Sequence, residues 1–169
     1  MHQVHQLQQQ HNMLYTKKGY NGSSSTLHTK ARKKKDDPLF EALGTLDELN
    51  SLLGVCRSYA QVERSKPIDV AQSLFHVQDT LFSIQAICAG SDVCQITQKH
   101  ITDMEHTISA IEKEIAPITN FTIPVSMRLS AYLDYARSVA RRAERMIVAL
   151  PSKYSNEHIK IGTRLANSC

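Results

Sequence analysis

Four arginines are concentrated in one short stretch, Arg137-Ser-Val-Ala-Arg-Arg-Ala-Glu-Arg145. Arg137, Arg141 and Arg145 recur every fourth residue, so a helix would place them on one face, where like charges repel by roughly a few tenths of a kcal/mol per pair. Anions offset such a row, either a bound phosphate chain or nearby carboxylates. The residues alone leave two interpretations open, a phosphate-binding row or ordinary surface arginines with an Arg141–Glu144 pair.

The segment Tyr15–Thr26 is a second candidate, because it combines glycines, serines, threonines and a lysine pair. Small residues let backbone N–H groups approach an anion closely, and hydroxyl groups add hydrogen-bond donors. The segment lacks the glycine and lysine spacing of a Walker A loop. Its composition alone favours a flexible linker over a phosphate-binding loop. The basic run Arg32–Lys35 that follows is more commonly a solvated charge run or tail.

Acidic residues follow Gly44 in the stretch Thr45-Leu-Asp-Glu-Leu. The spacing of Thr45 and Glu48 is that of a capping box and predicts a helix that begins at Thr45. Acidic side chains in the first turn also suit the helix dipole. Asp47 is in addition a plausible partner for the arginine row.

Positive charge is confined to the beginning of the chain. The net charge of the 169 residues is +4, yet the first 35 residues hold seven lysines and arginines and no acid. This split suggests a polyanionic partner or a basic tail.

No stretch approaches the roughly 18 apolar residues of a membrane span. The four cysteines have no metal-site spacing and are expected to be reduced, mostly buried thiols.

Four segments with apolar residues at helical spacing predict long amphipathic helices. They run from about Thr45 to Ala60, Ile68 to Ala89, Ile101 to Ile115 and Leu129 to Leu150. Short connections imply an all-α antiparallel bundle. We expect an incomplete fifth helix from Asn156 to Cys169, disorder in residues 1–14 and one domain from 15 to 169.

Five motifs occur in order along the chain and together resemble the PduO-type ATP:cob(I)alamin adenosyltransferases. The motifs are Tyr15–Thr26, Lys35–Asp37, Phe40–Leu49, Phe121–Pro124 and Ala136–Arg145. The resemblance implies a helical bundle with an N-terminal Gly/Ser/Lys nucleotide-binding loop. It also implies transfer of the 5′-deoxyadenosyl group from ATP to cobalt(I) of cobalamin, usually with Mg²⁺ and with release of triphosphate.

The resemblance assigns roles to residues of this chain by position. Residues matching the family's ATP contacts are Thr16, Lys17, Lys18, Gly19, Ser24, Ser25, Lys35, Arg141, Arg142, Ala143, Glu144, Arg145 and Thr163. Phe121, Arg142 and Glu144 match catalytic positions, Phe121 being the aromatic residue that crowds the lower face of the corrin. No residue is assigned as a metal ligand. Because cobalt(I) is itself the nucleophile, the protein's task is to position the 5′-carbon and neutralise the leaving triphosphate.

Assembly and location follow from the same resemblance. It implies a homotrimer with active sites between subunits, in which Asp47 and Arg137 match an ion pair across the interface. A cobalamin-dependent acceptor enzyme is a possible partner, whereas membranes and nucleic acids are not expected. The compartment would be the mitochondrial matrix in a eukaryote and the cytoplasm otherwise.

Several residues depart from the family pattern. They are Tyr20 in the loop, Ser126 and Met127 after the phenylalanine motif, Thr163 and Asn167 near the end. Together with the incomplete last helix they favour one alternative, a catalytically impaired scaffold that binds ATP or a corrinoid. A helical nucleic-acid binder is a more remote alternative, since aromatic residues do not alternate with the basic ones.

Overall fold

A computed structural model describes residues 19–26, 31–63, 69–115, 119 and 127–151 of the chain. These residues form four helices and two short strands. The elements are β1 (Ser23–Ser24), β2 (Lys33–Lys34), α2 (Pro38–Glu63), α3 (Val70–Cys88), α4 (Gln98–Glu114) and α5 (Arg128–Val148). The all-α helical prediction is confirmed. Among the described residues, no helix has the length and apolarity needed to cross a membrane.

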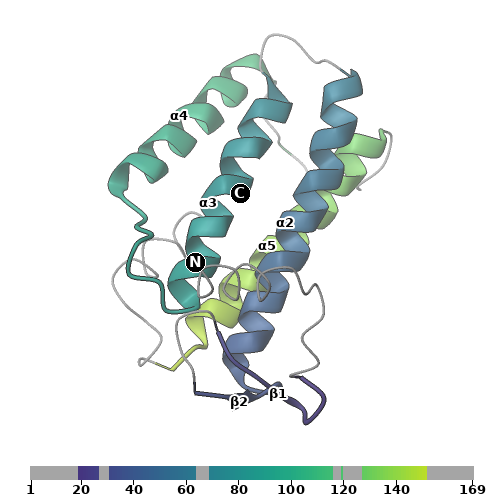
Figure 1. The fold of residues 1–169 in the computed structure, drawn as a ribbon. Coiled ribbons are helices and arrows are strands. Elements are labelled where there is room, and N and C mark those ends of the chain that lie inside the picture. Colours follow the sequence, from purple (N-terminus) through teal and green to yellow (C-terminus); the bar gives the residue numbers. More distant parts are fainter. Residues whose placement is uncertain (1–18, 27–30, 64–68, 116–118, 120–126, 152–169) are drawn as a thin grey trace, which may run out of the picture.

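Helix α2 is the centre of the bundle. It packs against α5 on one side and α3 on the other, and α4 lies outermost, next to α3 (Figure 1). The rings of Tyr59 on α2 and Tyr132 on α5 stack with centroids 5.4 Å apart. Arg142 of α5 donates a hydrogen bond to Glu48 of α2. Because the higher-numbered α5 residue faces the lower-numbered α2 residue, these two helices are antiparallel, as predicted.

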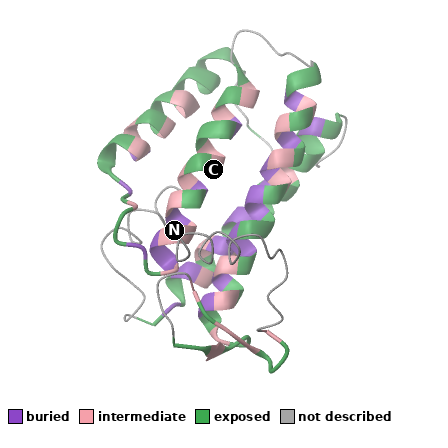
Figure 2. Ribbon diagram, viewed as in Figure 1, coloured by how far each residue is buried: buried purple, intermediate pink, exposed green. Residues whose placement is uncertain are grey.

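The core is a continuous cluster of aliphatic side chains from all four helices. Leu46, Cys56 and Ile96 are its most completely buried large side chains. Buried residues form stripes along the facing sides of α2, α3 and α5, whereas most of α4 is exposed (Figure 2). The heptad-like seam predicted for α5 is confirmed, because Leu129, Ala140 and Ile147 are among its buried residues.

The predicted start of the first helix at Thr45 is wrong. Helix α2 begins at Pro38, and Asp37 Oδ1 accepts a hydrogen bond from the N–H of Leu39 at 3.0 Å. Proline suits the first turn of a helix, where its missing N–H has no intrahelical partner. Thr45 lies within the helix instead, where its hydroxyl donates to the carbonyl of Glu41 at 2.8 Å.

The third predicted helix exists, but its apolar stripe is only partly buried. Ile101 is buried and Met104 packs against the core, whereas Ile111 and Ile115 are 37% and 50% exposed. A cavity of about 470 Å³ lies between α3 and α4, lined by side chains from Ser73 to Thr80 and from His100 to Thr107. Helix α4 therefore contacts the bundle mainly through its N-terminal half.

The described cysteines are free thiols, as expected, and two of them are buried. Burial raises the pKa of Cys88 to about 11 and also raises the pKa of Cys56. Only the thiolate reacts with thiol reagents. A pKa two units above the ordinary 9.0 lowers the thiolate fraction of Cys88 about 100-fold at pH 8. At pH 8 we expect both to resist an aromatic disulfide reagent until the protein is unfolded in urea. Peptide mapping checks this against half-buried Cys94, and rapid native labelling of Cys88 would contradict it.

Candidate functional site

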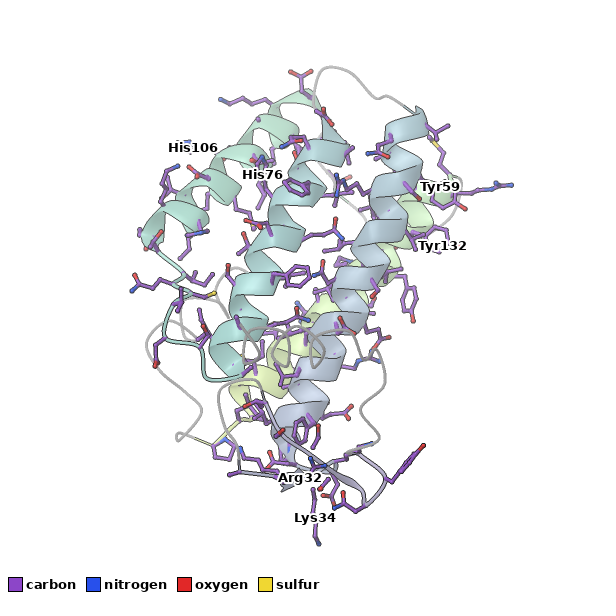
Figure 3. All side chains as sticks on the ribbon, in the orientation of Figure 1. Arg32, Lys34, Tyr59, His76, His106 and Tyr132 are labelled. Atoms are coloured by element: carbon purple, nitrogen blue, oxygen red, sulfur yellow. The ribbon has the colours of Figure 1, made fainter. Side chains whose placement is uncertain are left out.

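Two sequence segments with candidate phosphate-binding residues are joined by a small antiparallel hairpin. Ser23 pairs with Lys34 and Ser24 with Lys33, so the Gly/Ser segment lies along the basic run. The sequence presented these segments as separate possibilities, a linker and a charge run. The structure brings them together directly before the first turn of α2 (Figure 3).

Polar contacts hold the hairpin in one geometry. Arg32 donates from Nε to the hydroxyl of Ser23 at 2.8 Å and from Nη2 to the Ser23 carbonyl at 2.6 Å. The N–H of Lys35 donates to the carbonyl of Gly22 at 2.9 Å. Arg32 thus ties β2 to the hydroxyl and the carbonyl of Ser23 and helps to fix the shape of the loop.

Lys35 lies directly over Gly19. A Cβ atom on Gly19 would lie only 3.3 Å from Lys35 Nζ, so a larger residue at position 19 would displace the ammonium group. Gly19 and Lys35 are two of the predicted ATP contacts, and they are adjacent here although 16 residues apart in the sequence. Ser24 is half-buried and Ser25 exposed on the same loop.

Gly22 is the position where the loop depends on glycine. Its φ is +69°, and nothing lies within 4 Å of where a Cβ would stand, so a substitution would be penalised by backbone strain alone. The left-handed conformation disfavours alanine by about 1–2 kcal/mol, whereas asparagine tolerates it. We expect Gly22→Ala to speed hydrogen exchange of the Lys35 amide about fivefold or more. Gly22→Asn is the matched control and should leave that exchange nearly unchanged; equal exchange in both variants would contradict the strain argument.

The arginine row on α5 has two partners that the described residues show. Arg142 Nη2 donates to Glu48 Oε2 on α2, and Arg137 Nε donates to Asp134 Oδ1 at 2.9 Å. Arg141 and Arg145 are exposed and have no ion pair within the described part of the chain. The row therefore keeps cationic groups that are available to an anion.

The predicted Arg141–Glu144 alternative is not found among the described residues. Glu144 is half-buried with no hydrogen bond there, and Arg142, not Arg141, has an acidic partner. Ala143 is 2% exposed because its methyl group packs into the core. The whole residue, backbone included, is therefore covered in this structure, and its predicted contact with ATP stays a prediction.

Asp47 and Arg137 do not meet within the chain. Asp47 is exposed on α2, and it has no hydrogen bond or ion pair within the described residues. The guanidinium of Arg137 is engaged by Asp134, three residues earlier on the same helix. A pair between two subunits remains a prediction, and Asp134 would then compete for Arg137.

The hairpin lies at one end of the bundle, whereas the contacts Tyr59–Tyr132 and Glu48–Arg142 place the arginine row of α5 opposite the middle of α2. In Figure 1 the strands lie below the first turn of α2, and the C-terminal half of α5 comes down to the same end. Arg32 and Lys34 are labelled there in Figure 3, and the stacked Tyr59 and Tyr132 lie toward the other end. Cationic side chains of the hairpin thus lie at the end of the bundle where α2 begins, which suits a ligand with several negative charges.

Some predicted site residues cannot be placed. Thr16, Lys17, Lys18, Phe121 and Thr163 lie outside the described residues, as do the predicted disordered N-terminus and the incomplete last helix.

Glu48 is the residue that sequence reasoning missed at this site. It was interpreted as part of a capping box, and its contact with Arg142 shows a different role. The available signal was the acidic side chain next to Asp47 in the Phe40–Leu49 motif, because Asp47 was already a plausible partner for the arginines.

The sequence is similar to proteins of one family over most of its length. Residues 14–168 match the family model described as cobalamin adenosyltransferase. The chain is 34% identical over 146 residues to the bovine corrinoid adenosyltransferase MMAB, covering 81% of this chain and 59% of that protein. It is 37% identical over 144 residues to a corrinoid adenosyltransferase of Citrobacter freundii, covering 81% of this chain and 78% of that one. The chain thus spans less than two thirds of the bovine relative's length.

The fold is similar to that of solved structures as well. A variant PduO-type ATP:corrinoid adenosyltransferase from Lactobacillus reuteri, complexed with cobalamin and ATP, superimposes with a TM-score of 0.77 at 26% identity. The match covers 92% of this chain and 88% of that one. A second variant of the same enzyme, complexed with ATP, gives a TM-score of 0.76 at 26% identity.

Proposed function

Because the chain belongs to the cobalamin adenosyltransferase family, we propose that it transfers the 5′-deoxyadenosyl group of ATP to cobalt(I) of cobalamin. The observation that supports this most directly is that Lys35 lies against Gly19 in the loop, so that two positions matching the family's ATP contacts are adjacent. A similar protein binds both cobalamin and ATP. The cationic end suits the triphosphate of ATP, which would enter with Mg²⁺ held by its phosphates.

The proposed reaction needs no nucleophile from the protein. Cobalt(I) attacks C5′ of ATP, a Co–C bond forms, and the C5′–O5′ bond breaks so that triphosphate leaves with the electron pair. Charge grows on the leaving oxygen, and donors fixed near that oxygen lower the barrier most. We propose that Lys35 and Arg142 supply them, and that Phe121 crowds the lower face of the corrin.

The test is direct. Purified protein, ATP with Mg²⁺ and chemically reduced cobalamin should yield adenosylcobalamin and inorganic triphosphate, followed by the change in the cobalamin absorption spectrum and by chromatography. Denatured protein is the control for the uncatalysed reaction. Binding of ATP and cobalamin without any product would contradict the proposal and favour the impaired scaffold.

We propose further that the chain acts as a homotrimer. Supporting this, Val55 on α2 and Tyr132 and Tyr135 on α5 are 37–54% exposed, and a second copy could cover them. Asp47 is also free to pair with a basic residue of a second copy. Light scattering should give three times the 19.0 kDa of the chain; a monomer at working concentrations would contradict this.

A further inference from the structure

The contact between Glu48 and Arg142 differs from the other ion pairs of the described residues. Lys99–Asp103 and Arg137–Asp134 each join residues within one helix, whereas Glu48 and Arg142 join α2 to α5 across 94 residues of sequence. The two side chains are about 40% exposed, so solvent and a ligand can reach them. Among the four arginines between Arg137 and Arg145, Arg142 is the one seen to bond a residue of α2 in the described chain.

The backbones that carry this pair are rigidly held. Leu49 follows Glu48 and is 5% exposed, and Ala143 follows Arg142 and is 2% exposed. Both neighbours belong to the hydrophobic core between α2 and α5. The remaining freedom lies in the two long side chains, and the contact between them restricts it.

The geometry of the contact leaves most of the guanidinium available. An arginine carries five N–H donors, and only Nη2 of Arg142 is bonded to Glu48. A guanidinium already fixed at one corner loses less side-chain entropy when the remaining donors bind a phosphate. The Glu48 carboxylate also repels a phosphate chain, so the same residue should improve orientation and weaken binding.

We propose that Glu48 is a positioning residue, which fixes the Arg142 guanidinium so that its free N–H groups meet the leaving triphosphate. The inference rests on the proposed adenosyl transfer and assigns Glu48 a part in it. The two opposing effects can be separated, since orientation needs a hydrogen-bond acceptor and repulsion needs a charge. Glutamine keeps the acceptor and lacks the charge, whereas alanine lacks both.

The experiment compares Glu48→Gln and Glu48→Ala in steady-state kinetics with ATP as the varied substrate. We expect Glu48→Ala to lower kcat about tenfold, and Glu48→Gln to keep kcat within about twofold. KM for ATP should not rise in either variant, because both remove the repelling charge. Glu41→Ala, an exposed acid of the same helix with no ion pair in the described chain, is the matched control and should leave kcat unchanged.

A second comparison separates positioning from mere stability. In an Arg142→Ala background, Glu48→Ala should change kcat less than about twofold, because the guanidinium that Glu48 positions is absent. The inference is overturned if Gln and Ala give the same kcat, or if the Glu48→Ala loss persists in full without Arg142. Thermal melting of each variant reports whether it is folded. A wild-type protein that makes no adenosylcobalamin would contradict the proposed function itself and the inference with it.

Discussion

Replacing Arg142 by alanine is expected to lower kcat/KM for ATP at least about 100-fold, which corresponds to about 2.7 kcal/mol of transition-state stabilisation. The proposed reaction concentrates negative charge on the leaving triphosphate. Arg142 is the arginine of α5 whose side chain contacts Glu48 on α2. The loss should fall mainly on kcat, because an interaction that strengthens in the transition state contributes little to ground-state binding. Stopped-flow formation of adenosylcobalamin measures it.

Two further variants test whether charge or geometry is responsible. Arg142→Lys keeps the charge but loses the planar fork, so we expect kcat/KM to recover only part of the way, to about one tenth of wild type. Arg128→Ala is the matched control, because Arg128 begins the same helix about 21 Å away at 1.5 Å per residue. If Arg142→Ala were as active as Arg128→Ala, the triphosphate would have to be neutralised elsewhere.

The helices could be predicted from sequence where their periodicity was long and uninterrupted. The apolar seam from Leu129 to Leu150 predicted α5 to within two residues of its ends. The capping-box spacing of Thr45 and Glu48 predicts a start seven residues too late, because Gly44 and the residues before it are also helical. Glycine disfavours a helix by only about 1 kcal/mol relative to alanine, and the burial of Leu39, Ala42 and Leu46 outweighs that.

Burial of α4 was overestimated for a different reason. The steps between Ile101 and Ile115 describe a helix with one apolar face, but periodicity does not say what covers that face. In the described residues Ile101 is buried, whereas Ile111 and Ile115 are exposed and a cavity separates part of α4 from α3. Spacing within one helix carries no information on how far a neighbouring helix extends beside it.

The sequence proposed residues for the candidate site but none of the contacts between them. The motifs named Gly19, Lys35 and Arg142, and the structure adds that Lys35 covers Gly19 while Glu48 holds Arg142. Both contacts join segments that are distant in sequence, through a hairpin and an interhelical pair. Such pairings depend on register, which a single sequence does not specify.

Replacing Leu46 by alanine is expected to lower the free energy of unfolding by about 3 kcal/mol, within the 2–5 kcal/mol range typical of buried leucines. Leu46 is 2% exposed near the middle of the core, on the helix that packs against both α3 and α5. For a chain of this length the loss corresponds to a fall in Tm of about 5–12 °C. Scanning calorimetry at one fixed protein concentration measures it, since assembly would make Tm depend on concentration.

The control for Leu46 lies on the same helix. Val62 is 82% exposed, so Val62→Ala should change the free energy of unfolding by less than about 0.5 kcal/mol. A comparable loss in both variants would mean that α2 is not the central helix. Because Leu46 lies two residues before Glu48, a Leu46→Ala protein that is still folded should also lose some of the Arg142-dependent activity. That coupling would show that the core between α2 and α5 sets the position of the arginine.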